Sequence, residues 1–254
     1  MAKEKTEKEI DILVINKGRI AFALMGNAPL ICNRMSEKAK RELLLPHGRL
    51  SAAEKKSRLK HNPLEEYQAS PYTDRNPKGP TLIQMLASSF KGAMKTAALD
   101  LPGASKAQIS RLVWTIGDRV AIYGVPQLFM SVTRSADMNK TPDVRTRAIL
   151  PRWAAYVEVA FATPILKEVA VQNLMGAAGL MQGVGDWRAG KGSGSYGTFD
   201  VVNGDDPEFL DIVNTGGRKA QEAAMASPEF YDGETEELYA WYETEAQRRG
   251  FKVA

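Results

Sequence analysis

Cysteine and histidine are scarce in this 254-residue chain, which has one cysteine, Cys32, and two histidines, His47 and His61. A single cysteine excludes an intramolecular disulfide and a cluster of thiolates around a metal ion. The two histidines have no cysteine or carboxylate partner at the spacing of metal ligands. We therefore expect no metal and no cofactor, and we interpret both histidines as surface residues or phosphate contacts.

Long apolar segments are also missing. No run of about 18 apolar residues occurs, which argues against a membrane-spanning helix. The first residues are rich in Lys and Glu, which argues against a signal peptide. No segment repeats with a period of about 20 to 50 residues, so a repeat protein is not expected. Together with the single cysteine, these features predict a cytoplasmic protein without a membrane partner.

Charge is unevenly distributed along the chain. The net charge is +4, but residues 1–199 hold 29 Lys and Arg against 17 Asp and Glu (+12), while residues 200–254 hold 5 against 13 (−8). A basic body indicates a polyanionic partner. We interpret the acidic segment as a solvated face, with docking onto a basic surface of a neighbouring copy as the alternative.

Composition divides the chain into a core and less regular parts. We expect a disordered tail at residues 1–9, a core at residues 10–203 and an acidic helical extension at residues 204–254. Within the core, residues 31–80 hold 11 basic and 6 acidic residues and several prolines. We expect this segment to form an inserted, mobile basic thumb or flap. The alternative is a solvated linker helix.

Alternating and helical patterns predict the regular elements of the core. Strands are predicted at residues 10–15 and 19–24 (one strand or a pair around Lys17-Gly18), 120–125, 128–134, 154–161 and 197–202. Helices are predicted at residues 36–45, 88–98, 105–113 and 166–180, the last with Val169 and Leu174 on its core-facing stripe. Val157, Val159 and Phe161 are expected to face the core.

The order of these elements is close to a β-α-β-β-α-β ferredoxin-like, or RRM-like, unit with a basic insertion. The predicted fold class is therefore α+β. In such a unit two helices cover one face of the sheet, and the other face is free to accept single-stranded RNA.

The segment Gly183–Gly197 is rich in glycine and also holds Trp187, Arg188, Lys191 and Tyr196. Glycines permit positive φ and a close approach of the backbone to a ligand. Basic side chains suit phosphate and flat aromatic faces suit stacking. We interpret the segment as an ordered binding loop, with a flexible surface loop as the alternative. Trp187 can equally be a core anchor that fixes the loop.

Two phosphate motifs nearly fit this segment. Gly185–Lys191 has P-loop spacing, but Gly192 stands where a P-loop needs Ser or Thr for magnesium, and Gly192–Gly197 has the spacing of the dinucleotide fingerprint. Each motif requires a strand before the loop and a helix after it. Here the predicted helix comes first and the strand follows. We therefore expect the loop to bind a polymer rather than a mononucleotide.

Other basic residues stand at the predicted ends of elements. Ser88 and Ser89 are expected to cap a helix that holds Lys91 and Lys95 in its first turns, an arrangement that can hold a phosphate. Ordinary capping with exposed lysines is the alternative. Three arginines, Arg145, Arg147 and Arg152, precede the clearest strand.

Three of these segments resemble the RAMP superfamily, the RRM-like proteins of CRISPR effector complexes. Thr81–Lys95 resembles its Ser-Ser-Phe-Lys-Gly-Ala helix start, Arg145-Thr146-Arg147 resembles its Arg-Thr-Arg segment, and Gly183–Gly197 resembles its glycine-rich loop. The resemblance covers about residues 10–202. It points to backbone subunits that polymerise along a guide RNA and to related proteins of phages and mobile elements. The acidic segment has no clear counterpart in the superfamily.

The resemblance implies a non-catalytic protein that binds single-stranded RNA and assembles head to tail with other copies in a helical filament, with further effector subunits as additional partners. No histidine lies inside a matching motif, so a nuclease activity is not implied. The residues expected to contact nucleic acid are Arg34, Lys38, Arg41, Ser88, Ser89, Lys91, Lys95, Arg145, Arg147, Arg152, Gly183, Gly185, Trp187, Arg188, Lys191 and Tyr196.

Three alternatives stay open. A phage or mobile-element protein of the same fold can coat single-stranded DNA, because contacts to the 2′-hydroxyl leave no local sequence signature. A metal-independent ribonuclease using His47 or His61 is less favoured, because both lie in a proline-rich segment and acid–base chemistry needs a held geometry. The last alternative is a structural assembly protein that does not bind nucleic acid.

Overall fold

The computed structural model describes residues 12–35, 40, 43–44, 59–134, 142–189 and 194–251. Its elements in chain order are β1 (Asn16–Gly26), β2 (Leu30–Ile31), α3 (Pro63–Ala69), β3 (Tyr72–Thr73), β4 (Ile83–Leu86), α4 (Ala87–Ala97), α5 (Lys106–Leu112), β5 (Val113–Thr115), β6 (Arg119–Tyr123), β7 (Gln127–Arg134), β8 (Pro142–Leu150), β9 (Ala154–Thr163), α6 (Glu168–Met181), β10 (Phe199–Val202), α7 (Pro207–Thr215), α8 (Arg218–Ala226) and α9 (Gly233–Arg248). The protein combines helices with antiparallel sheets, which agrees with the predicted α+β class. Of the helices described, none is long and apolar enough to cross a membrane.

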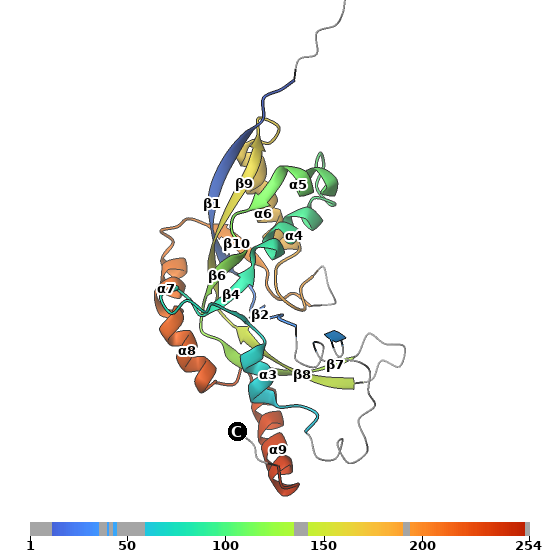
Figure 1. Ribbon diagram of the computed structural model, residues 1–254, viewed down its shortest axis with the longest axis vertical. Helices are drawn as coiled ribbons and strands as arrows, with labels where there is room; N and C mark the ends of the chain where they lie inside the picture. The colour runs from blue at the N-terminus through green and yellow to red at the C-terminus, as the bar shows by residue number, and fades with distance from the viewer. Residues whose placement is uncertain are drawn as a thin grey trace, which may run out of the picture.

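The larger sheet has the strand order β10-β1-β9-β6-β4-β3, and β5 also pairs with β9. Helices α4, α5 and α6 lie on one side of it (Figure 1). The core lies between these helices and the sheet, and its β9 side chains are Val157, Val159 and Phe161, all buried. The alternation that predicted this strand and its buried face is confirmed.

Strand β1 is a single continuous strand that passes through Lys17-Gly18 without a turn. It pairs with β9 from Asn16 to Met25. Residues 12–15, predicted as part of a strand, come before it and are exposed. The predicted tail at residues 1–9 lies outside the described residues.

Helix α6 was predicted, but its buried face was placed wrongly. Val169 is 62% exposed, whereas Val171, Met175 and Gly179 are buried beside Leu174. A Cβ atom built on Gly179 would overlap the backbone oxygen of Phe199, so the helix packs on β10 through a residue without a side chain. The stripe expected from the sequence was Leu166, Val169, Ala170, Leu174, Ala177 and Ala178. It is right at Leu174 and Ala178 and wrong at Val169 and Ala170, which are exposed.

The smaller sheet has the order β2-β8-β7 and lies below the larger one, beside α3 and α9 (Figure 1). Tyr67 of α3 is fully buried, and its hydroxyl donates to the carbonyl oxygens of Pro126 at 3.3 Å and Ala224 at 3.1 Å. The described part of the segment 31–80 that follows residue 58 is therefore built into the fold and is not a flap on its surface. Residues 36–39, 41–42 and 45–58 lie outside the description.

The acidic segment is helical, as predicted, and it packs against the core. Phe209 and Ile212 of α7 are buried against Ala23 and Ala154, on the sheet face opposite α4 and α6. Gln221 of α8 is fully buried and bonds to backbone groups of three segments, Leu82–Ile83, Ile122–Gly124 and Gly216. Side chains of this segment are thus part of the hydrophobic and polar interior.

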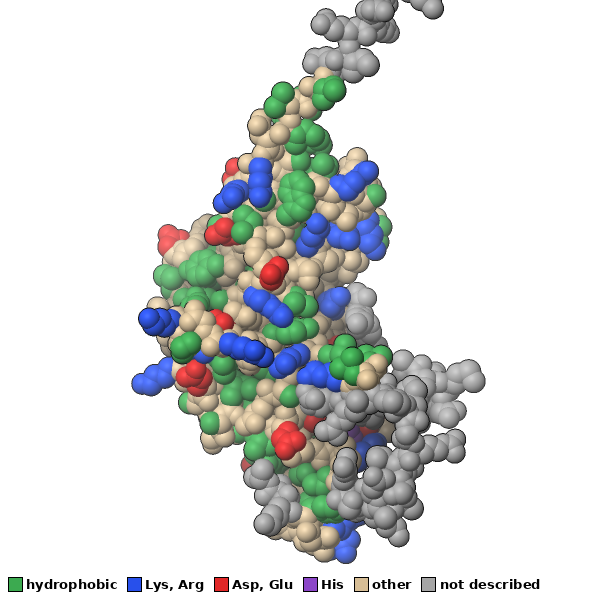
Figure 2. Space-filling model, in the orientation of Figure 1, with side chains coloured by type: hydrophobic (Ala, Val, Ile, Leu, Met, Phe, Trp, Pro, Cys, Tyr) green, Lys and Arg blue, Asp and Glu red, His purple; other side chains and the backbone are tan. Residues whose placement is uncertain are grey.

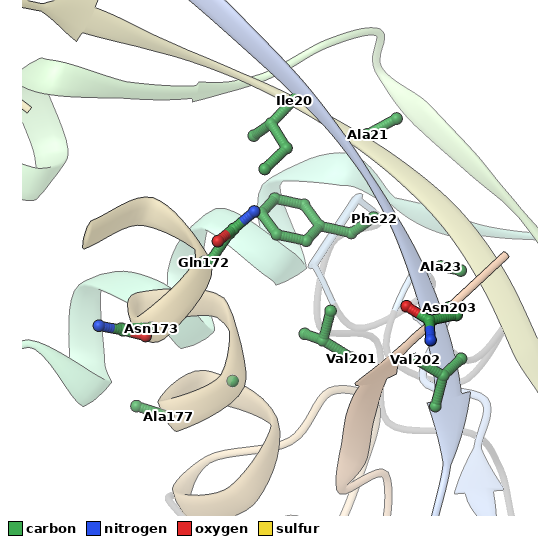
Figure 3. Close-up of a pocket in the computed structure, with 11 residues that line it drawn as sticks. Ile20, Ala21, Phe22, Ala23, Gln172, Asn173, Ala177, Val201, Val202 and Asn203 are labelled. Carbon is green, nitrogen blue, oxygen red and sulfur yellow. The ribbon is translucent and has the colours of Figure 1, made fainter. Parts of the chain in front are cut away.

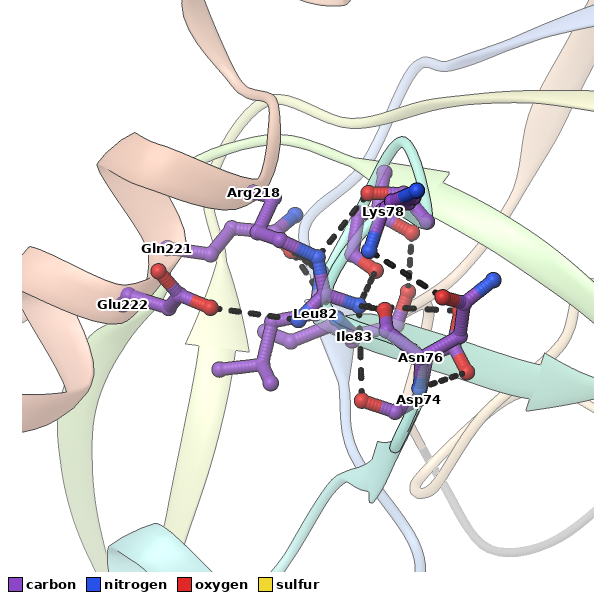
Figure 4. Close-up of polar contacts among 10 residues, drawn as sticks. Asp74, Asn76, Lys78, Leu82, Ile83, Arg218, Gln221 and Glu222 are labelled. Atoms are coloured by element: carbon purple, nitrogen blue, oxygen red, sulfur yellow. Dashed lines mark hydrogen bonds and ion pairs between the residues drawn. The ribbon is translucent and has the colours of Figure 1, made fainter.

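Arg218 fixes the start of α8 to the turn before β4 (Figure 4). Its guanidinium donates to the carbonyl oxygens of Gly79 at 2.9 Å, Asn76 at 2.7 Å and Thr81 at 2.9 Å. It also pairs with the Asp74 carboxylate at 3.5 Å. The positive charge of Arg218 therefore holds a backbone turn and is not offered to a ligand.

The prediction that the serine pair caps α4 is wrong. The helix begins at Ala87, its N-cap residue is Leu86, and no side chain bonds to its first amides. Ser88 and Ser89 therefore lie inside the first turn, and a phosphate held by a serine cap is not supported here. Helix α5 does have a side-chain cap, because the Ser105 hydroxyl accepts from the Gln108 amide at 3.2 Å.

Candidate nucleic-acid interface

The glycine-rich loop is attached to β2 by backbone hydrogen bonds. The Gly197 amide donates to Pro29 O at 2.8 Å, and the Asp186 amide donates to Ile31 O at 3.0 Å. A third bond, from the Val184 amide to Gly197 O at 2.9 Å, closes the loop on itself. Gly183 and Gly197 have φ of 63° and 70°, values that side chains disfavour. Glycine is thus required at these two positions, where the described parts of the loop meet.

Two aromatic rings of the loop stack on each other. The rings of Trp187 and Tyr196 have centroids 5.8 Å apart and an interplanar angle of 18°. Tyr196 also contacts Phe129 of β7, with centroids 6.4 Å apart. Trp187 is 37% exposed, so it is not a buried anchor, and its φ of 53° is unusual for a residue with a side chain. The stack therefore presents a partly exposed indole in a fixed position.

Arginines of β8 lie on the face of the smaller sheet that carries this stack. Arg147 pairs with Phe129 across the strands and Arg145 pairs with Ser131, and residues two apart share a face. Arg147 Nη1 donates to Arg34 O at 3.0 Å, which brings the end of the β2 segment to the same place. Arg147 Nε is buried and has no hydrogen-bond partner among the described residues.

The positive charge of this group is not neutralised by the described part of the chain. Arg34, Arg145, Arg147 and Arg188 form no ion pair with a described carboxylate. Arg188 Nη1 instead donates to Gly185 O at 2.8 Å, within the loop. More widely, Lys and Arg side chains gather across the middle of the face in Figure 2. We call Arg34, Arg145, Arg147, Arg188 and the Trp187–Tyr196 pair the arginine–aromatic face.

Phe129 and Tyr231 belong to this place and were missed by the sequence analysis. Their rings meet edge to face with centroids 5.4 Å apart, and together with Ile31 and Ile149 they form a small apolar cluster under Tyr196. The alternating pattern of residues 128–134 could have predicted on which face of the strand Phe129 lies. Tyr231 lies 35 residues after Tyr196 in the sequence, and only the fold brings it here.

Other predicted contact residues lie elsewhere. Arg152 pairs with Glu208 at 3.5 Å and with Asp211 at 3.0 Å, both on α7. Ser88 and Lys91 line a separate hollow with Trp114 and Arg119. Burial and the neighbouring Lys95 lower the pKa of Lys91.

Gly183 and Gly185 are buried supports of the loop. Lys38, Arg41 and Lys191 lie outside the described residues.

Comparison of the sequence with protein-family models gives no match, and comparison with curated proteins gives none either. The RAMP resemblance therefore remains a prediction from three short segments.

Cys32, next to Arg147, is buried, and burial raises the pKa of its thiol to about 12 although the Arg147 charge acts in the opposite direction. The thiol is thus protonated at neutral pH and is no nucleophile. Within the described ranges, no group of three or more His, Cys, Asp or Glu residues could hold a metal ion.

His61 is held between two carboxylates. Its Nδ1 lies 2.8 Å from Glu66 Oε1 and its Nε2 lies 3.0 Å from Asp143 Oδ1. The hydrogen bond to Glu66 is the main cause that raises the pKa of His61, and burial opposes it. Since both ring nitrogens are engaged, the histidine ties α3 to β8, and neither nitrogen is open to a substrate in this arrangement. His47 lies outside the described residues.

This arrangement predicts a pH-dependent stability. Because the pKa of His61 is raised in the folded state, its contribution to stability is complete below about pH 6.5 and is lost as pH rises through the folded pKa. We expect the urea midpoint of unfolding to fall between about pH 6 and about pH 9. The His61→Gln variant, which cannot titrate, should show a clearly smaller fall. An equal fall in both proteins would contradict the assignment.

Proposed function

We propose that the protein is a non-catalytic binder of single-stranded nucleic acid, with RNA as the preferred polymer, and that the strand runs over the arginine–aromatic face. Four guanidinium groups can neutralise backbone phosphates, and the exposed part of Trp187 can stack on a base. The glycines let the loop backbone approach the strand closely.

The observation that carries this proposal is the combination of uncompensated arginines with an ordered aromatic pair. Arginines that only stabilise a fold are engaged like Arg218, which bonds to carbonyl oxygens and one carboxylate of the turn before β4. Arg145 is exposed on the same sheet face as Arg147, and neither pairs with a described carboxylate. A polyanion supplies the missing negative charge.

The strand order of the larger sheet supports an RRM-like core. Strands β10-β1-β9-β6 are adjacent and antiparallel, α4 precedes β6, and α6 joins β9 to β10. A β-α-β-β-α-β unit of ferredoxin-like type has this arrangement. The face of the sheet expected to be free is covered in part by α7, since Phe209 and Ile212 are buried on it. We therefore place the strand on the arginine–aromatic face instead.

Removal of one exposed arginine tests the proposal. The Arg145→Gln variant should bind a fluorescent single-stranded RNA about tenfold more weakly in an anisotropy assay. The slope of log affinity against log salt should become shallower by about 0.7, the value for one phosphate contact to a single strand. The same titration with a DNA oligomer of equal sequence compares the two polymers, and equal or stronger DNA binding would favour the DNA-coating alternative.

Arg152→Gln is the matched control, because Arg152 is also an exposed arginine but is paired with Glu208 and Asp211. We expect its affinity to stay within about twofold of the unchanged protein. Equal losses in the two variants would show a general charge effect rather than this face. Absence of salt-sensitive binding to both polymers in the unchanged protein would overturn the proposal.

A further inference from the structure

The edge of the larger sheet is open along the first part of β1. Strand β9 pairs with β1 from Asn16 to Met25, but on the other side β10 pairs with it only from Ala23 to Gly26. The backbone of residues 16–22 therefore has no strand partner on that side among the described residues. Such an edge is a template for an additional strand.

A hollow of about 550 Å³ lies along this edge, between β1 and α6 (Figure 3). Ile20 and Phe22 of β1 point toward α6 in this view, and Gln172 of the helix lies beside the Phe22 ring. Gly176 contributes no side chain, and nothing lies within 4 Å of a Cβ atom built on it. The hollow is thus wide enough at this point to receive side chains from an added strand.

An exposed apolar segment directly precedes the open edge. Ile12, Leu13, Val14 and Ile15 are between 57% and 80% exposed. Figure 1 shows this segment continuing β1 beyond the end of the sheet, and Figure 2 shows hydrophobic side chains along it. Four consecutive large aliphatic residues in extended backbone are rare on a protein surface unless another chain covers them.

The segment cannot cover its own edge. Ile15 is bonded to Asn16, the first residue of β1, and the strand runs on without a turn. Pairing within one copy would need a reversal between residues 15 and 16. Among the described residues, no part of the same copy pairs with this segment, and a second copy offers it the open edge.

We infer that two copies of this chain pair β1 against β1, antiparallel, around a two-fold axis near Lys17. Pairing of a partner's residues 12–15 with residues 19–22 fills the open edge up to Ala23, where β10 begins. In this register the partner's Ile12 and Val14 lie opposite Phe22 and Ile20. Directly opposed residues share a face, so these four side chains are on the same side of the joined sheet. The partner's Ile12 and Val14 enter the hollow beside α6, and the two larger sheets join into one.

In the two-fold arrangement one contact pairs the open edge and the apolar segment of both copies, and most homodimers have this symmetry. Four aliphatic side chains, Ile12 and Val14 of each copy, enter the two hollows, while Leu13 and Ile15 lie on the other face because side chains alternate along a strand. Val169, exposed one turn before Gln172 and Asn173 on α6, lies on the helix side that borders the hollow.

This dimer does not depend on the proposed function, because it uses none of the residues of the arginine–aromatic face. It also differs from the head-to-tail contact that the RAMP resemblance implies, since a two-fold contact closes and a head-to-tail contact does not.

Light scattering after gel filtration of the nuclease-treated full chain gives the test. The unchanged protein should have the mass of a dimer, and the Val14→Asp variant half of that mass with an unchanged thermal midpoint. Val132→Asp is the matched control, because Val132 is an exposed strand valine away from β1, and it should stay dimeric. Gly176→Lys fills the hollow from the acceptor side and should weaken the dimer at least tenfold.

A cross-link tests the axis. Lys17→Cys should form an intermolecular disulfide under mild oxidation, because residue 17 lies near the two-fold axis and therefore opposite residue 17 of the other copy. Cys32 is buried and does not compete. A monomer at every concentration, a mass that grows beyond the dimer, or an unchanged Val14→Asp dimer would each overturn the inference. Binding of Val14→Asp to a short RNA should equal that of the unchanged protein, which separates this result from a failure of the proposed function.

Discussion

Gln221→Leu should lower the free energy of unfolding by about 3 to 5 kcal/mol, a large part of the roughly 5 to 15 kcal/mol that stabilises a typical domain. The Gln221 side chain is fully buried and makes five hydrogen bonds. Its Oε1 accepts from the amides of Leu82 at 2.8 Å and Ile83 at 2.9 Å. Leucine has a similar volume and no polar group, so it leaves these amides without their partner in the interior.

The amide nitrogen of Gln221 is equally engaged. Its Nε2 donates to the carbonyl oxygens of Ile122 at 2.7 Å, Gly124 at 3.0 Å and Gly216 at 3.0 Å. The side chain therefore joins α8 to the start of β4 and to the end of β6, as Figure 4 shows for the contacts with Leu82 and Ile83. Gln221→Glu keeps the acceptor oxygens but loses the donors, and should destabilise the protein at least as much at neutral pH.

Urea unfolding followed by circular dichroism measures both changes. Lys219→Leu is the control, because Lys219 lies two residues away on the same helix and is exposed, and it should change the free energy by less than about 0.5 kcal/mol. A loss below about 1 kcal/mol in Gln221→Leu would contradict the assignment of α8 to the structural core.

The sequence was most informative where large side chains alternate. Strand β9 and its buried side chains were predicted from the spacing of Val157, Val159 and Phe161. It was least informative for Gln221. A buried polar residue in an acidic helix cannot be distinguished by its sequence pattern from a polar residue on the exposed face. No local pattern indicates that backbone groups of two distant segments, at residues 82–83 and 122–124, surround its side chain.

The candidate interface was predicted in part for a similar reason. The glycine-rich loop and the Arg145–Arg147 pair were found because their residues are unusual and close together in the sequence. Arg152 looked equivalent, but α7, about 55 residues later, brings Glu208 and Asp211 to it. Ion pairs between distant segments depend on the fold. The charges close to Arg152 in the sequence therefore could not predict its pairing with Glu208 and Asp211. Of the smaller sheet, which holds the loop and the arginines together, only strand β7 was predicted, at residues 128–134, and it was not assigned to a separate sheet.

Gly197→Ala should reduce binding of single-stranded RNA by at least about tenfold while most of the fold is retained. Gly197 has a φ of 70°, and a Cβ atom there would overlap the Val184 carbonyl oxygen. The strain of such a residue is about 1 to 3 kcal/mol, and the overlap with backbone adds to it. The loop relieves both by giving up the bonds that Gly197 makes to Pro29 and Val184. Trp187 and Arg188 then lose their fixed positions, because they are held only through this loop.

Anisotropy with a labelled RNA and thermal unfolding of the same samples separate affinity from stability. Gly204→Ala is the matched control, since nothing lies within 4 Å of a Cβ atom at that turn and its φ is not positive. It should bind RNA like the unchanged protein. If Gly197→Ala keeps full affinity, the loop does not position the contacts and the interface must lie elsewhere. If it loses affinity and melts within a few degrees of the unchanged protein, the loss belongs to the loop, because a displaced surface segment removes ordered contacts with the strand without opening the buried core.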